Sequence, residues 1–170
     1  MHSTLARLPL RVLALALFAV CGALLAFGLY LQHVKGIEPC PMCIMQRYAL
    51  LGCGLIGLLA GLHAPGPGGT CAYAGLLMLT ALAGGGVAAR QSWIQWFPPA
   101  VSECGPGLEY MLESFPLSSA LPMIFRGAGD CSLVDWTFLG LSIANWSFLC
   151  FAVILLAALA VLTRRSTPGA

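Results

Sequence analysis

The residues best suited to chemistry in this sequence are two cysteines in the segment Cys40-Pro41-Met42-Cys43. With two residues between them, both sulfurs lie at the N-terminus of one helix, where the helix dipole and free backbone amides favour the thiolate. A thiolate is the attacking species in thiol–disulfide exchange. The spacing therefore predicts that Cys40 and Cys43 form a redox-active pair.

A zinc half-site is the competing interpretation, because Cys-x-x-Cys also occurs in metal sites. Zinc would need four clustered thiolates or added histidines, and the sequence has no second Cys-x-x-Cys. Cys104 and Cys131 lie far apart in the chain, and His33 is the histidine nearest to the motif. We therefore favour redox chemistry and expect no metal.

Arg47 follows Cys43 by one helical turn, so both side chains can face the same spot. A guanidinium there can stabilise a thiolate or an oxygen of a bound electron acceptor. The ordinary alternative is that Arg47 snorkels to the lipid headgroups. Gln46 is a second candidate for the same pocket.

The elements that must position these residues are four apolar stretches, each about 20 residues long, which is the length a bilayer core requires. They cover residues 10–31, 44–62, 71–89 and 143–162. Only 8% of the residues are charged, against about 25% in soluble domains. Because the backbone must satisfy its own hydrogen bonds in lipid, the stretches are expected to be helices. We predict an all-α integral membrane protein: one four-helix transmembrane bundle over residues 1–170, with the lipid bilayer as its surroundings.

Two connecting segments carry the chemistry, residues 32–43 and 90–142. In the longer one, apolar residues recur at helical spacing at positions 108, 111, 112 and 115, and Pro116 stops the pattern. This pattern indicates a short helix on the membrane surface. An amphipathic turn packed on the bundle predicts the same spacing and remains an alternative.

Charge predicts the orientation of the bundle. With four spans both termini share a side, and Arg7, Arg11, Arg164 and Arg165 flank the membrane there. The opposite side carries as many Lys and Arg residues, but short flanks weigh more than long loops. We therefore expect both termini in the cytoplasm and both redox loops outside. The formal net charge of +2 gives no reason to expect a nucleic-acid partner.

The eight cysteines divide by location. Four lie in apolar stretches, where a thiol behaves as a small hydrophobe: Cys21, Cys53, Cys71 and Cys150. Four lie in the two outer loops, where an oxidising compartment preserves disulfides: Cys40, Cys43, Cys104 and Cys131. Four cysteines allow three pairings, and the sequence favours Cys40 with Cys43 and Cys104 with Cys131.

At these residues the chain resembles the disulfide bond formation protein B (DsbB) family, the quinone-linked membrane oxidases of the bacterial periplasm. The resemblance covers nearly the whole chain. It includes the segment Cys40-Pro41-Met42-Cys43-Ile44-Met45-Gln46-Arg47 and a long second outer loop with two cysteines. It also includes Asp130-Cys131 followed by Trp136-Thr137-Phe138-Leu139-Gly140-Leu141.

The resemblance implies an enzyme of the bacterial inner membrane and a route for its electrons. A reduced thioredoxin-fold partner of the DsbA type, in the periplasm, would attack Cys104 and free Cys131. Cys40 and Cys43 would then exchange with the outer pair. Cys43 would pass two electrons to a membrane quinone, ubiquinone or menaquinone, held beside Arg47.

Two other functions remain open from the sequence. A vitamin K epoxide reductase-like protein is also a small helical membrane bundle with Cys-x-x-Cys and a quinone, but its active motif would be expected late in the chain. A metal-binding or bundle-forming membrane subunit without enzymatic activity would carry merely structural cysteines. Quinone reduction by the purified protein with a dithiol partner would separate an oxidoreductase from such a subunit.

Overall fold

The computed structural model describes residues 10–98, 113–116, 118–119, 122 and 131–166. Its long elements are four helices, α1 (Leu10–His33), α2 (Pro41–His63), α3 (Pro67–Trp96) and α6 (Ile143–Ser166). Each of the four is long and apolar enough to cross a membrane. The prediction of a four-helix, mostly helical membrane protein is therefore confirmed.

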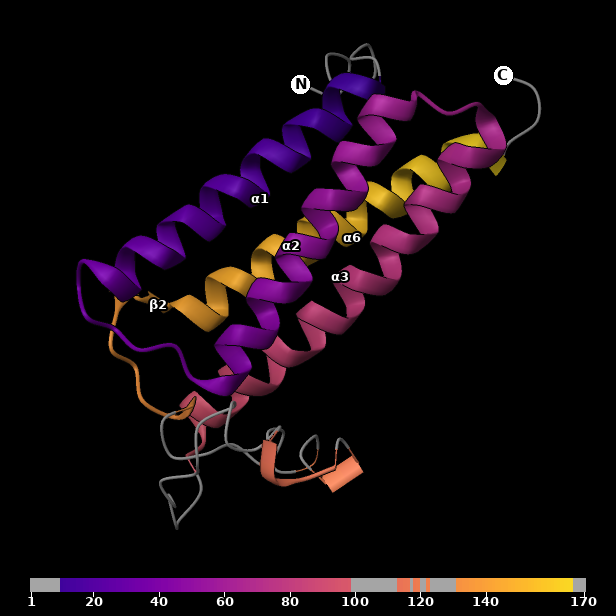
Figure 1. Ribbon diagram of the computed structural model, residues 1–170. Coiled ribbons are helices and arrows are strands. Elements are labelled where there is room, and N and C mark those ends of the chain that lie inside the picture. The colour runs from indigo at the N-terminus through magenta and orange to yellow at the C-terminus, as the bar shows by residue number, and fades with distance from the viewer. Residues whose placement is uncertain (1–9, 99–112, 117, 120–121, 123–130, 167–170) are drawn as a thin grey trace.

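The helices lie side by side as one bundle, with the start of α1, the α2–α3 turn and the end of α6 at the same end (Figure 1). We call the opposite end the redox end, because α2 begins there next to Cys40. Helix α1 packs on α2, α2 on α3, and α3 on α6. Among the described residues, α1 and α6 are not a closely packed pair.

Small residues allow this close packing, as is common between membrane helices. A Cβ added at Gly57 would lie 2.9 Å from the backbone oxygen of Ala14 in α1, and one at Gly61 would lie 2.7 Å from the Leu15 side chain. At Gly84 the same addition would run into the ring of Phe151 in α6. The contacts of α2 with α1, and of α3 with α6, therefore depend on glycine.

All four helices extend beyond the predicted apolar stretches, and the extensions of α2 and α3 bear most on the site. Helix α2 begins at Pro41, not at residue 44, because proline is suited to the first helical position and Cys40 caps the helix. Helix α3 covers Pro67–Trp96, not 71–89, so residues 90–96 belong to a helix and not to the second redox loop. Hydropathy marks where lipid ends, whereas a helix continues through polar residues as long as its backbone bonds are made.

A tight hairpin that the sequence did not predict precedes α6. Its strands β1 (Thr137–Phe138) and β2 (Leu141–Ser142) pair antiparallel, with Thr137 opposite Ser142. Between them Leu139 and Gly140 have φ angles of 52° and 78°. Positive φ at both central residues is the geometry of a type I′ turn, which matches the twist of paired strands.

The membrane-surface helix predicted in the long loop lies mostly outside the described residues. Its last part is described: Glu113 and Ser114 are helical, and the chain bends at Phe115 before Pro116. The surface helix therefore stays a prediction.

Candidate active site

The two cysteines of the motif lie together at the start of α2. Cys40 caps the helix, and its sulfur accepts a hydrogen bond from the backbone N–H of Cys43 at 3.4 Å. The two Sγ atoms are 3.1 Å apart, and both residues are free thiols in this structure. Cys40 is buried and Cys43 is half-buried. The local geometry brings both sulfurs to one helix N-terminus, as the spacing predicts.

Cys131 joins this pair from far along the chain. It is fully buried and belongs to the same apolar cluster as Cys40 and Met42. Its thiol hydrogen bonds with Cys40, and this contact is the main cause that raises the pKa of Cys40 above its ordinary value. The second thiol neighbour, Cys43, and burial raise the pKa of Cys40 further. Cys40 is thus held as a protonated thiol between two other sulfurs.

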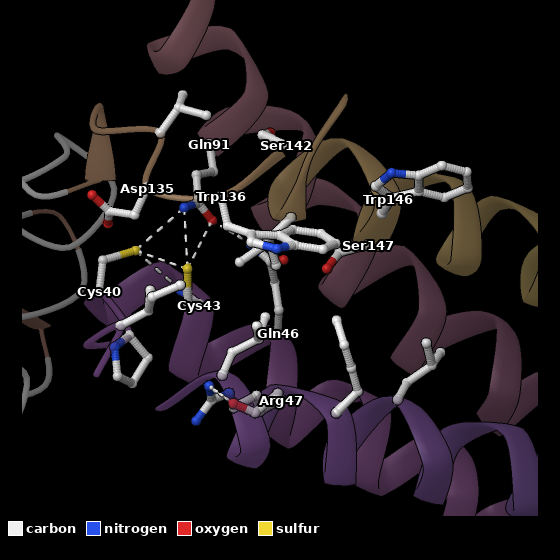
Figure 2. Close-up of a pocket in the computed structure, with 18 of the residues that line it drawn as sticks. Cys40, Cys43, Gln46, Arg47, Gln91, Asp135, Trp136, Ser142, Trp146 and Ser147 are labelled. Carbon is white, nitrogen blue, oxygen red and sulfur yellow. Dashed lines mark hydrogen bonds between the residues drawn. The ribbon is translucent and has the colours of Figure 1, made fainter. Parts of the chain in front are cut away.

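A glutamine of α3 completes the surroundings of the sulfurs (Figure 2). The side-chain Nε2 of Gln91 donates to Cys43 Sγ at 3.2 Å and to Cys40 Sγ at 3.3 Å. Its Oε1 accepts a hydrogen bond from Gln46 Nε2 at 2.6 Å. Both glutamines are 3% exposed, so their amides are buried and paired.

Cys43 lines a cavity of about 570 Å³ at the redox end. The walls come from α1, α2, α3 and α6 and from the segment around the hairpin, and they are mostly apolar. Trp136 meets Phe27 of α1 edge-on at 5.6 Å and stacks on Phe138 at 6.1 Å. Trp146 of α6 donates its Nε1–H to the Phe138 backbone oxygen at 3.0 Å. The hairpin and its aromatic rings therefore form the wall between α1 and α6.

Arg47 lines the same cavity, and its guanidinium is held by α1. Nη1 donates to Gln32 Oε1 at 2.6 Å, and Nη2 donates to the Gly28 backbone oxygen at 2.9 Å. Both acceptors are neutral, so they orient the positive charge without neutralising it. Other N–H groups of a guanidinium remain as donors. Arg47 is half-buried.

A second pair of polar residues fixes the segment after Cys131. Gln95, one turn beyond Gln91, donates to the Leu133 backbone oxygen at 3.4 Å and accepts from the Ser142 hydroxyl at 2.6 Å. The Ser142 oxygen also accepts the backbone N–H of Asn145 at 3.4 Å, in the first turn of α6. Helix α3 thus ties the loop, the hairpin and α6 together at the redox end.

The structure brings five of the six predicted site residues to the redox end: Cys40, Cys43, Cys131, Gln46 and Arg47. Cys104 lies outside the described residues. Sequence analysis missed Gln32, Gln91 and Gln95. Gln91 and Gln95 are polar, lie one turn apart and follow directly after an apolar stretch, and this was the signal that could have found them.

Comparison with known proteins decides the family. Residues 10–161 match the family model described as "Disulfide bond formation protein DsbB". The chain belongs to the DsbB family. The "Disulfide bond formation protein B" of Azoarcus sp. (strain BH72) is 70% identical over 155 residues, which cover 91% of this chain and 93% of that protein.

Other proteins named "Disulfide bond formation protein B" are similar to this chain over nearly its whole length. The protein of Aromatoleum aromaticum is 63% identical, covering 91% of this chain and 93% of its own length. That of a Polaromonas species (strain JS666) is 58% identical, covering 92% of each. As a DsbB protein, the chain is a multi-pass protein of the bacterial inner membrane and a disulfide oxidoreductase, which reoxidises a DsbA-type dithiol oxidase and passes the electrons to quinone. The vitamin K epoxide reductase-like alternative is thereby set aside.

Proposed function

We propose that Cys43 delivers electrons to a quinone bound in the cavity beside Arg47, after Cys104 and Cys131 have received them from a DsbA-type partner in the periplasm. The net reaction converts the partner dithiol and a quinone into the partner disulfide and a quinol. One observation carries this proposal: the sulfur-bearing residue Cys43 and the guanidinium of Arg47 line the same cavity.

The residues of the cavity fit a quinone. Its aromatic and aliphatic lining suits an apolar ring and tail, and Arg47 offers N–H donors to a carbonyl oxygen. A quinone takes up two electrons and two protons when it accepts the electrons of a dithiol. Both cysteines of the pair line the cavity, but Cys43 is the less buried of the two and lies one helical turn before Arg47, so we assign the transfer to Cys43.

The position of Cys131 supports a relay through Cys40. Once the partner has reduced the outer pair, the Cys131 thiolate attacks the Cys40 sulfur of the Cys40–Cys43 disulfide. The Cys131–Cys40 bond forms, the Cys40–Cys43 bond breaks, and Cys43 leaves as a thiolate. Cys104 then attacks the Cys131 sulfur, which re-forms the outer disulfide and returns Cys40 as a thiol. The contact between Cys40 and Cys131 is the geometric support for this order.

The finer identities follow from the chemistry of the same site. The acceptor is a membrane quinone, ubiquinone or menaquinone, whose apolar ring and tail suit the lining of the cavity. The partner is a soluble thioredoxin-fold dithiol oxidase that reaches Cys104 from the periplasm, so the redox end faces the periplasm. Because α1 begins and α6 ends at the opposite end of the bundle, both termini then lie in the cytoplasm. The lipid bilayer supplies the quinone, and neither a metal nor nucleic acid takes part.

Purified protein tests the proposal directly. With a reduced DsbA-type partner and a water-soluble quinone, the wild-type protein is expected to convert quinone to quinol. The loss of quinone absorbance measures the rate of this conversion. The Cys43→Ser variant is expected to lose quinone reduction while Cys104 still exchanges with the partner. Quinone reduction at the wild-type rate in Cys43→Ser would contradict the role given to this residue.

A further inference from the structure

Gln91 is buried beside the redox pair and touches both sulfurs. From α3 its Nε2 reaches Cys43 Sγ at 3.2 Å and Cys40 Sγ at 3.3 Å. The only group that the described residues place against its Oε1 as a strong donor is the amide of Gln46, at 2.6 Å. The Cys43 thiol itself approaches Oε1 only at 3.7 Å.

We propose that Gln91 is a further catalytic residue, which stabilises the Cys43 thiolate by donating Nε2–H to its sulfur, and that Gln46 is the positioning residue that fixes the direction of this amide. The proposal rests on the function proposed above and adds a residue to the same site.

The orientation of the Gln91 amide decides whether it stabilises or destabilises the Cys43 thiolate. An amide can present either oxygen or nitrogen to the sulfurs, and only nitrogen stabilises negative charge there. Gln46 donates its Nε2–H to Oε1 of Gln91, which leaves the nitrogen facing Cys40 and Cys43. Because both side chains are 3% exposed, water does not compete for these bonds.

The reaction step that benefits is the opening of the Cys40–Cys43 disulfide. When the Cys131 thiolate attacks Cys40, the bonding electron pair of the broken bond goes to the Cys43 sulfur. That sulfur lies 3.2 Å from Gln91 Nε2. Hydrogen bonds to charged groups are among the stronger ones in proteins. A neutral donor also stabilises the leaving thiolate without adding a titrating group to a buried site.

The first experiment compares reduced wild-type protein with Gln91→Leu. We expect the rate of Cys43 alkylation by iodoacetamide at pH 7, read by mass spectrometry, to fall by about tenfold. In dithiol buffers, the equilibrium constant for reducing the Cys40–Cys43 pair is expected to fall by about tenfold as well, which is about 30 mV for a two-electron couple. A merely structural role for Gln91 would leave both values within about twofold of wild type in folded protein.

The second variant keeps the test open if Gln91→Leu fails to fold. In its ionised form the carboxylate of Gln46→Glu can only accept, so it takes a hydrogen bond from Nε2 of Gln91 and turns the amide around. The Gln91 oxygen then faces the sulfurs, and we expect Cys43 to be alkylated more slowly than in the wild type, as in Gln91→Leu. A rate equal to wild type in folded Gln46→Glu would overturn the positioning role, and an equal rate in both variants would overturn the proposal.

Ser92→Ala is the matched control on the same helix. The Ser92 hydroxyl is buried and has no hydrogen-bond partner among the described residues, and it contacts neither sulfur of the pair in any hydrogen bond. Its removal is expected to leave both values unchanged. The readouts need no partner and no quinone, so a failure of the proposed function would appear in the wild-type turnover assay and not here.

Discussion

The guanidinium of Arg47 is fixed to α1 at Gly28: Nη2 donates to the Gly28 backbone oxygen at 2.9 Å, and a Cβ at position 28 would lie 3.4 Å from Arg47 Nε. This contact turns the side chain toward the neighbouring helix and into the cavity wall. Helix α1 therefore contributes to the site although it carries none of the predicted catalytic residues.

Replacing Arg47 is expected to weaken quinone use before it weakens the fold. Arg47→Met keeps the apolar stem and removes a charged donor, a loss of about 1.5 to 3 kcal/mol. The apparent affinity for quinone should fall by roughly 10- to 150-fold in steady-state turnover. Arg90→Met is the matched control, because Arg90 does not line the cavity. An unchanged quinone affinity in folded Arg47→Met would favour snorkelling.

Gln32 is expected to act only through Arg47. Gln32→Leu removes the acceptor of Nη1, and because the pair is half-buried we expect a loss of about 1 kcal/mol in quinone affinity, or about fivefold. In an Arg47→Met background the same change should have no further effect. Equal losses in both backgrounds, measured as a double-mutant cycle, would show that Gln32 acts independently of Arg47.

The order of the cysteines predicts which one is trapped with the partner. In Cys131→Ser no second thiol of the outer pair can expel the partner, so Cys104 is expected to accumulate a mixed disulfide after incubation with oxidised partner. Peptide mapping after acid quenching identifies the site. A mixed disulfide at Cys40 or Cys43, with Cys104 still free, would reverse the proposed electron flow.

Alkylation of Cys40 is expected to require a higher pH than alkylation of an ordinary thiol. Its raised pKa, caused first by Cys131, means that the thiolate is scarce at pH values where an ordinary thiol, with a pKa of about 8.5, is already ionised. The alkylation rate at Cys40 should therefore still be rising above pH 9, and Cys131→Ala should move this rise to lower pH. A rate that levels off near pH 8.5 in the wild type would contradict the shift.

Topology can be tested at the turn between α2 and α3. Gly68, in the first turn of α3 directly after that connection, is suitable because a Cβ there meets nothing within 4 Å. In Gly68→Cys, with both termini in the cytoplasm, a membrane-impermeant maleimide should not label position 68 in intact spheroplasts, but should label it after lysis. Labelling of position 68 in intact spheroplasts would show the opposite topology, with both termini in the periplasm.

Local sequence was sufficient for the helices and for the motif. An apolar stretch of bilayer length leaves the backbone few alternatives to a helix, and the Cys40–Cys43 spacing and the turn to Arg47 lie within one helix. Gln91 was not predicted, because its role depends on which face of α3 meets α2. The close approach of Gly84 to α2, where an added Cβ would lie 2.7 Å from the Ala49 side chain, helps to decide that face. The approach of Cys131 to Cys40 likewise requires the hairpin and Gln95 to place a distant loop.

Among the described residues α1 and α6 are not a closely packed pair, and aromatic rings stand between them in the cavity wall, so we expect quinone to reach the cavity from the lipid on this side. A quinone that enters from the lipid binds according to its mole fraction among the lipids, and not according to its amount per volume of solution. Diluting the same amount of quinone with more detergent or more lipid should therefore raise the apparent KM, even when the amounts of quinone and protein per volume are unchanged.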